Sequence, residues 1–181
     1  TCSKGRWLMD IFRPDMYKRS IYEIDYEQLH KKGIKCILFD LDNTLASLEE
    51  QTPDKKLMDF FLYLEDLGIK AIIISNASKK RVEPFKEKCN VDSAFKSYKP
   101  FKKKYQKILK MYHLKDIDIA CVGDQLLTDI YGANRQGFTS ILVNPISSKE
   151  KFATKINRGL EKIILNNFSK KGIFKKGEYY E

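Results

Sequence analysis

Two aspartates, Asp40 and Asp42, follow the short apolar run Cys36–Phe39, and Thr44 comes two positions later. A short apolar run bounded by polar residues is typical of a buried strand. Carboxylates at the buried end of a strand are costly unless they are paired or bind a cation. In an open parallel sheet, the carboxyl ends of the strands form the edge at which ligands bind. The segment 40–44 is therefore a candidate catalytic loop, although an Asp-rich turn without a function has the same pattern.

More polar groups lie close to predicted strand ends farther along the chain. They are Ser75, Asn76, Lys99, Asp124 and Asp129. If the strands are parallel, these groups converge with the first loop on one edge of the sheet. This set of side chains suits phosphoryl transfer. One carboxylate can attack phosphorus, and a second can protonate the leaving oxygen and then activate water. A lysine and a hydroxyl can hold the phosphoryl oxygens, and oxygen-only ligands suit Mg²⁺.

The segments that would position these groups alternate between strand and helix. Strands are predicted at 36–39, 69–74, 94–95, 117–122 and 139–143, and helices at 25–32, 53–67, 79–89, 101–112, 126–135 and 151–165. The second helix is expected to be capped at Thr52-Pro53. This alternation predicts a three-layer, Rossmann-like α/β core with a mostly parallel five-stranded sheet and right-handed crossovers.

We expect three segments: a basic and aromatic leader (1–24), a core domain (25–168) and a basic tail (169–181). The leader is expected either to pack on the core or to lie on a membrane interface. The tail is expected to be mobile.

The net charge of +10, from 34 Lys and Arg against 24 Asp and Glu, favours an anionic partner. A membrane surface and a phosphorylated substrate both satisfy it, whereas the chain has no recognised RNA-binding motif, so no nucleic acid is expected.

The 4 cysteines show no metal-site spacing and suit a reducing cytoplasm. No apolar run is long enough to span a bilayer. We therefore expect a cytoplasmic protein. Peripheral attachment to the inner face of the membrane is a second, narrower expectation.

The polar segments resemble, in order, the four motifs of the haloacid dehalogenase (HAD) phosphatases. The matching segments are Asp40-Leu-Asp42-Asn43-Thr44, Ser75-Asn76, Lys99-Pro100 and Gly123-Asp124 with Asp129. The gaps between the motifs leave no room for a cap domain, so the resemblance implies the uncapped (C0) type. An uncapped site admits a phosphate presented by a large molecule or a membrane, and an oligomer could supply the missing wall.

The resemblance also implies a role for each residue. Asp40 would be the nucleophile and a Mg²⁺ ligand, and Asp42 the general acid and base with its main-chain carbonyl on the metal. Asp124 would complete the metal site. Thr44 would brace the loop and lie with Ser75, Asn76 and the catalytic Lys99 around the phosphoryl group. Asn43 would contribute its backbone N–H, and Gly123 would let the backbone come close to the site. Asp129 would orient Lys99 or a metal-bound water.

A narrower resemblance, covering most of the chain, is to the YqeG subfamily of HAD type IIIA phosphatases. It includes the segments Phe12-Arg-Pro14-Asp15-Met-Tyr17, Arg81-Val82, Asn144-Pro145-Ile146 and Thr154-Lys155-x-Asn157-Arg158. It departs at Ala46-Ser-Leu-Glu-Glu50, where relatives often have a proline-tryptophan turn. Related mitochondrial proteins dephosphorylate phosphatidylglycerophosphate to phosphatidylglycerol, which implies a membrane-held anionic phospholipid as substrate. A soluble phosphatase for nucleotides or sugar phosphates, and a non-catalytic scaffold, remain the alternatives.

One basic cluster has two interpretations. Lys102, Lys103, Lys104, Lys107 and Lys110 follow the Lys99-Pro100 motif on a predicted helix. They form either a membrane-facing surface or an ordinary solvated helix side.

Overall fold

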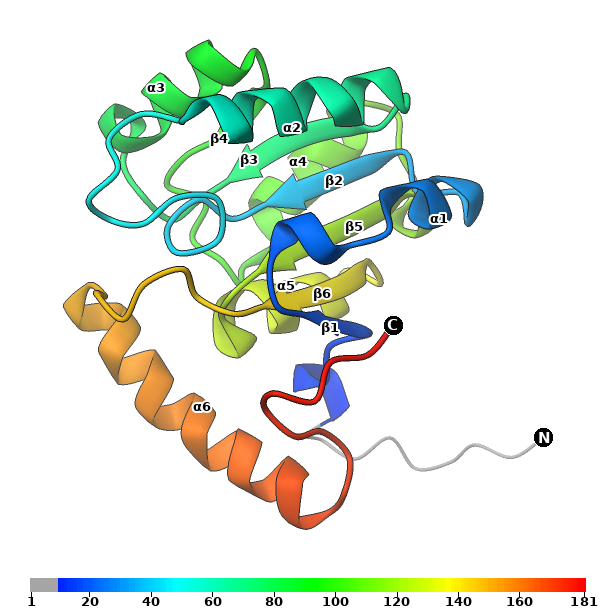
Figure 1. Cartoon of the computed structure of the whole chain (residues 1–181). Helices are drawn as coiled ribbons and strands as arrows, with labels where there is room; N and C mark the ends of the chain where they lie inside the picture. The colour runs from blue at the N-terminus through cyan, green and yellow to red at the C-terminus, as the bar shows by residue number, and fades with distance from the viewer. Residues whose placement is uncertain (1–9) are drawn as a thin grey trace.

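The computed structural model describes residues 10–181, which form a parallel sheet between two layers of helices (Figure 1). The six strands run in the order β1-β6-β5-β2-β3-β4, and all neighbouring pairs are parallel. Their bounds are β1 Met16–Lys18, β2 Cys36–Phe39, β3 Lys70–Ile74, β4 Asp92–Ala94, β5 Ile119–Gly123 and β6 Thr139–Val143. The predicted α/β class is confirmed, but the strand count of five was one too low. The additional strand is β1, whose three residues are too few to show a period.

The helices fall close to their predicted positions. They are α1 Tyr26–Lys31, α2 Lys55–Asp66, α3 Lys79–Cys89, α4 Lys102–Met111, α5 Tyr131–Asn134 and α6 Phe152–Lys170, with a π-helical segment, Leu126–Ile130, before α5. Asp25 caps α1 as predicted, since its side chain accepts a hydrogen bond of 2.8 Å from the N–H of Gln28. The cap of α2 was misplaced. It is Asp54, which accepts a hydrogen bond of 2.8 Å from the N–H of Leu57.

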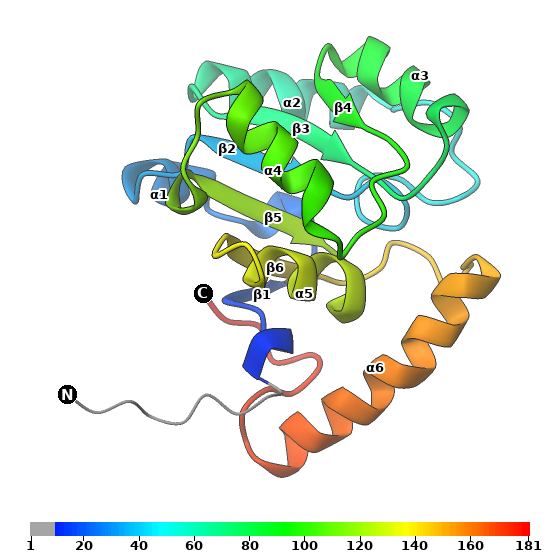
Figure 2. The same ribbon diagram turned by 180° about the vertical axis from the view of Figure 1, so that it is seen from behind.

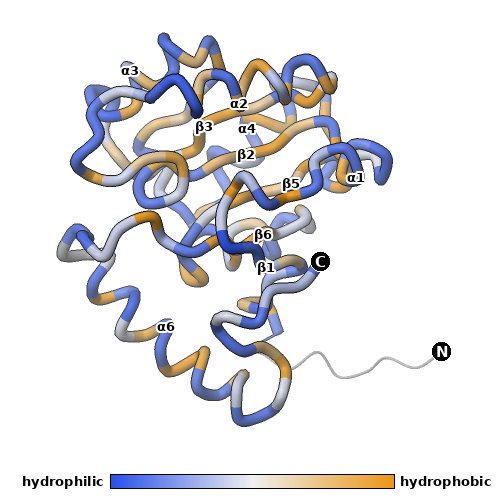
Figure 3. Tube along the Cα trace, in the orientation of Figure 1, coloured by the Kyte–Doolittle hydropathy of each residue, from blue (hydrophilic) through white to orange (hydrophobic). Residues whose placement is uncertain are grey.

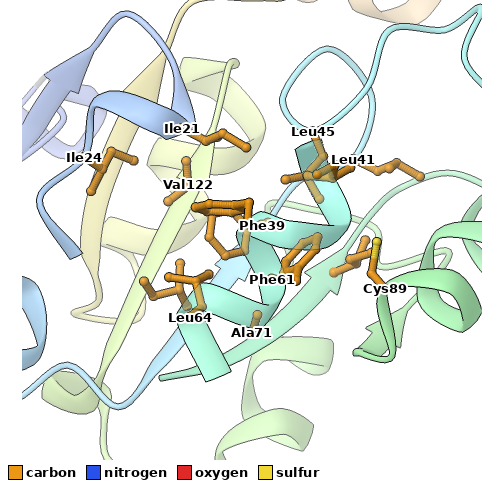
Figure 4. Close-up of a cluster of buried hydrophobic side chains, with 14 of the residues drawn as sticks. Ile21, Ile24, Phe39, Leu41, Leu45, Phe61, Leu64, Ala71, Cys89 and Val122 are labelled. Carbon is orange, nitrogen blue, oxygen red and sulfur yellow. The ribbon is translucent and has the colours of Figure 1, made fainter. Parts of the chain in front are cut away.

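The core lies on both faces of the sheet, because successive side chains of a strand point to opposite faces. On one face Phe39 packs edge-on against Phe60 and Phe61 of α2, with ring centroids 5.8 Å apart in both pairs. Figure 4 shows Phe39 and Phe61 together in this cluster. On the other face Leu38 packs with Tyr105 and with residues of α4 and α5. Apolar residues follow the strands in Figure 3. Burying a large apolar side chain stabilises the fold by about 1.5–3 kcal/mol, so Phe39 anchors β2 immediately before Asp40.

The connections after β2 and β3 are short. Residues 40–54 join β2 to α2, and residues 75–78 join β3 to α3, so within the described chain no cap domain is inserted at either place. In the same part of the chain, no helix combines the length and the apolar content needed to cross a bilayer.

Both ends of the described chain pack on the core. Phe12 stacks on Tyr131 with ring centroids 4.9 Å apart, and Ile21 is buried. Figures 1 and 2 show α6 leaving the sheet at an angle, after which the chain returns to β1. There Tyr180 exchanges two backbone hydrogen bonds with Tyr17, so the expectation of a mobile tail is wrong for this segment.

The division into leader, core and tail stays a prediction. Residues 1–9 of the predicted leader lie outside the described chain. Within the described chain, Cys36, Cys89 and Cys121 are buried free thiols, as expected for small apolar fillers.

Candidate active site

The loop after β2 is a tight turn that turns two aspartates toward the carboxyl edge of the sheet. The N–H of Asp40 donates a hydrogen bond of 2.9 Å to the carbonyl of Val122, so the β2–β5 pairing continues one residue past the strand. The carbonyl of Leu41 accepts from the N–H groups of Thr44 and Leu45 at 3.3 and 3.0 Å. Asn43 completes the turn with a φ of 65°, a conformation that asparagine tolerates better than most residues.

Lys99 joins two of the aspartates. Its Nζ donates hydrogen bonds to Oδ1 of Asp40 at 2.6 Å and to Oδ1 of Asp129 at 2.5 Å, and all three side chains are at most 7% exposed. Charge-assisted bonds of this kind are about twice as strong as neutral ones. Burial raises the pKa of Asp40 to about 7, although Lys99 acts in the opposite direction. Burial alone would lower the pKa of Lys99, but the carboxylates of Asp129 and Asp40 outweigh it and raise this pKa above its ordinary value.

The segment after β3 holds the backbone of Lys99. Asn76 accepts a hydrogen bond of 2.7 Å from the N–H of Lys99 through Oδ1, and donates one of 3.3 Å to its carbonyl through Nδ2. The hydroxyl of Ser75 accepts a hydrogen bond of 3.1 Å from the N–H of Ala77. The second and third motifs are thus held together by the side-chain amide of Asn76.

Asp124 follows β5 and is almost completely buried. Its Oδ1 accepts a hydrogen bond of 3.3 Å from the hydroxyl of Thr44, and its Oδ2 pairs with Arg158 of α6. Burial raises the pKa of Asp124 to about 8, against the opposing effect of Arg158. The nearby carboxylates of Asp40 and Asp129 add to the increase, since like charges disfavour ionisation.

Gly123 is required by the position of Asp129. A Cβ atom added at Gly123 would lie 2.2 Å from Cγ of Asp129, closer than real side chains come. The π-helical segment carries Asp129 into this place, where its Oδ2 accepts a hydrogen bond of 3.1 Å from the N–H of Gln125.

Three of the carboxylates suit a hard divalent cation. Asp40, Asp124 and Asp129 are buried, and each offers an oxygen within 4.8 Å of the others. An oxygen-only set of this kind is typical of Mg²⁺ sites, and a dication would offset the repulsion among the three carboxylates. The predicted ligand set differs, because it assigns Asp129 a supporting role and includes Asp42. The assignment of Asp42 to the metal through its main-chain carbonyl stays a prediction.

Asp42 lies apart from this cluster, at the rim of the site. Its carboxylate accepts a hydrogen bond of 2.9 Å from Nε of Arg81 on α3 and pairs with Lys151 at the start of α6. Arg81 also donates a hydrogen bond of 2.8 Å to the carbonyl of Ser47, so the guanidinium ties Asp42 to the loop that follows it.

A cavity of about 240 Å³ joins these groups. Seven predicted site residues line it, namely Asp40, Asp42, Asn43, Ser75, Asn76, Lys99 and Asp124. Thr44, Gly123 and Asp129 lie behind its wall and position the lining residues. Other lining residues were not among the predicted site residues: Leu48, Ala77, Gln125, Thr128, Glu150, Lys151, Thr154 and Asn157.

The cations Arg81, Lys151 and Arg158 were also missed as site residues. Arg81 and Arg158 lie in segments that carry the YqeG resemblance, and this was the available signal. Their partners are 39 and 34 residues away in the sequence, so local patterns could not assign them.

The fold, the site and the relatives that follow together indicate an α/β phosphoric monoester hydrolase. A family model described as mitochondrial PGP phosphatase matches residues 9–147, and the chain belongs to this family. It is similar to Probable phosphatase YqeG of Bacillus subtilis (strain 168), with 36% identity over 165 residues that cover 91% of this chain and 96% of that protein.

It is also similar to phosphatidylglycerophosphate phosphatase 1, chloroplastic/mitochondrial, of Arabidopsis thaliana, with 26% identity over 171 residues. That alignment covers 88% of this chain and 49% of the plant protein, so this chain spans about half of its length.

Two solved structures share the fold. A HAD superfamily (subfamily III A) hydrolase from Legionella pneumophila has a TM-score of 0.51 and 23% identity, over 82% of this chain and 91% of that one. A 3-deoxy-D-manno-octulosonate 8-phosphate phosphatase from Yersinia pestis has a TM-score of 0.51 and 14% identity, over 64% of this chain and 67% of that one.

Proposed function

We propose that this chain is a Mg²⁺-dependent phosphatase that hydrolyses a phosphomonoester through an aspartyl-phosphate on Asp40. We propose further that the substrate is phosphatidylglycerophosphate, which is converted to phosphatidylglycerol. The observation that carries the proposal is the position of Asp40 in the wall of the cavity, with Oδ1 held 2.6 Å from Lys99 and Asp124 close by.

In the first step, an oxygen of Asp40 attacks phosphorus, and the bond between phosphorus and the leaving oxygen breaks. Asp42 gives its proton to the leaving oxygen, and an acyl phosphate remains on Asp40. In the second step, Asp42 takes a proton from water, which attacks phosphorus and releases phosphate and the carboxylate of Asp40. Lys99 and the hydroxyl of Ser75 donate hydrogen bonds to the phosphoryl oxygens in both steps.

Asp40 and Asp124, with Asp129 or the main-chain carbonyl of Asp42, would hold the Mg²⁺. The ion would offset the negative charge that develops on the phosphoryl oxygens.

The phospholipid substrate is supported by two features of the chain. The site has no cap among the described residues, so a phosphate fixed to a large surface can reach it. The net charge of +10 favours an anionic membrane over a neutral one. A relative named phosphatidylglycerophosphate phosphatase 1 supports the same substrate. We propose action at the cytoplasmic surface of the membrane.

The experiment is phosphate release from phosphatidylglycerophosphate in mixed micelles, compared with a panel of nucleoside monophosphates and sugar phosphates. We expect kcat/KM to be highest for the phospholipid, activity to need Mg²⁺, and Asp40→Asn to be inactive in every assay. A soluble ester that is hydrolysed as well as the phospholipid would contradict the substrate. Activity of Asp40→Asn would contradict the mechanism.

A further inference from the structure

Helix α6 exposes a row of apolar side chains. Ile156, Leu160 and Ile163 are 54%, 51% and 66% exposed, and their spacing places them on one face of the helix. A neighbouring face of the helix is buried, with Ile164 and Phe168 in the core. Single exposed apolar residues are ordinary, but a row of them on one helix face marks an interaction surface.

A second exposed apolar pair stands beside the catalytic lysine. Tyr98 and Phe101 enclose the Lys99-Pro100 motif, and each is 65% exposed. Aromatic side chains are enriched at the interface between a membrane and water. We call Tyr98, Phe101, Ile156, Leu160 and Ile163 the docking face.

Both parts of the docking face adjoin the site cavity. Thr154 and Asn157 lie in the same turn of α6 as Ile156 and line the cavity from another face of the helix, and Lys99, which lies between the two aromatic residues in the sequence, lines it as well. Figure 2 shows that α4 and α6 both begin at the sheet edge toward which the strand arrows point. A surface that covers both parts of the docking face therefore lies close to the cavity.

Lysines accompany both parts. Lys102 and Lys103 follow Phe101, and Lys155 and Lys162 lie beside the α6 row, all of them exposed. Within residues 10–181, neither Lys155 nor Lys162 forms an ion pair. Apolar side chains beside basic ones are complementary to an anionic bilayer, whose headgroups attract lysine while its acyl region accepts the apolar groups.

We infer that the docking face seats this protein on an anionic phospholipid bilayer, with the site cavity opening toward the headgroups. The purpose of this contact rests on the proposed function. The contact itself is inferred from the exposure and charge of the side chains that lie near the cavity.

The test is co-sedimentation with vesicles made of equal parts of phosphatidylglycerol and phosphatidylcholine. The wild type is compared with Ile156→Ser/Ile163→Ser and with the matched control Ile117→Ser. Ile117 is 70% exposed but precedes β5, at the opposite edge of the sheet. We expect the double variant to partition about tenfold more weakly or worse, and the control to bind like the wild type. Equal binding by the double variant, or an equal loss in the control, would overturn the inference.

Stability, salt dependence and oligomeric state give three further measurements of the docking face. The melting temperatures of the three proteins should agree, because the replaced side chains face water. Wild-type binding should weaken as the salt concentration rises, and it should be weaker on vesicles of pure phosphatidylcholine. Binding that is unchanged by both would contradict an anionic partner. Light scattering tests a second copy of the chain as the occupant. A dimer that the double variant disrupts without losing vesicle binding would overturn the bilayer.

These measurements require no activity. A wild type that binds the vesicles but releases no phosphate from the phospholipid would contradict the proposed substrate and would still agree with the proposed docking face.

Discussion

Arg158 donates hydrogen bonds to both the carboxylate and the main-chain carbonyl of Asp124, the latter at 2.6 Å. Through this pair, the last long helix of the chain reaches the end of the central strand β5. Arg158 is itself held by Glu150 at 2.7 Å and by Glu161 at 2.9 Å, and Glu161 accepts a hydrogen bond of 3.1 Å from the N–H of Leu127. Helix α6 is therefore part of the site, and its Arg158 positions a carboxylate proposed to bind metal.

Replacing Arg158 should destabilise the protein. Arg158→Met leaves Asp124 and Glu161 buried without their cation, and we expect a loss of about 2–4 kcal/mol in the free energy of unfolding. Arg158→Lys keeps the charge but loses the paired donors, so its loss should be smaller. Urea unfolding measures both. An Arg158→Met variant as stable as the wild type would show that the ion pair does not contribute to the free energy of unfolding.

Asp40→Asn should abolish phosphate release at a small cost in stability. The variant removes the proposed nucleophile, and an amide cannot form the acyl phosphate in its place. It also removes a buried acid whose pKa burial raises to about 7, so the free energy of unfolding should change by less than about 2 kcal/mol. Phosphate assays and thermal melting check the two parts. A variant that turns over normally would refute the role of Asp40.

Asp42→Asn should affect the two steps differently. With a phospholipid or an alkyl ester, we expect kcat to fall by about 10²–10⁴-fold, the usual contribution of a general acid or base. With p-nitrophenyl phosphate the leaving group needs no proton, so phosphorylation of Asp40 should persist while hydrolysis slows. Rapid mixing should then show a burst of one equivalent of nitrophenol, and mass spectrometry should show a phosphorylated chain. Equal slowing of both steps would argue against an acid and base role for Asp42.

Gly123→Ala and Gly159→Ala form a matched pair. At Gly123 the added methyl group meets Asp129 at 2.2 Å, so we expect a loss of about 1–3 kcal/mol in the free energy of unfolding and a loss of activity. At Gly159 on α6 an added Cβ meets nothing within 4 Å, and alanine should stabilise the helix by up to about 1 kcal/mol. Denaturant unfolding compares them. Two variants of equal stability would mean that Asp129 can move without cost.

Mg²⁺ should stabilise the folded chain through the cluster of Asp40, Asp124 and Asp129. At a hundredfold excess over its Kd, a ligand adds about 2.7 kcal/mol to the free energy of unfolding, which raises the melting temperature. A chelator should reverse the increase, and Asp124→Asn should abolish most of it. Thermal melting with and without Mg²⁺ gives the result without an activity assay. An identical shift in the variant would place the ion elsewhere.

Local patterns were sufficient for much of the fold. Apolar runs predicted β2, β3, β5 and β6, and Asp25 predicted the start of α1, because a strand or a cap depends on residues close in the sequence. Parallel pairing then brings the ends of β2, β3 and β5 to one edge, so the convergence of Asp40, Ser75 and Asp124 on one cavity followed from the order of the elements.

The sequence by itself thus determined which residues stand at the ends of the central strands and which chemistry they can perform. The tertiary structure decided which cations hold those acids: Lys99 on Asp40 and Asp129, Arg81 and Lys151 on Asp42, and Arg158 on Asp124. It also decided that β1 joins the sheet and that the C-terminal segment returns to it. These contacts join residues far apart in the chain, and their formation depends on packing of the whole core, which no local period or propensity describes.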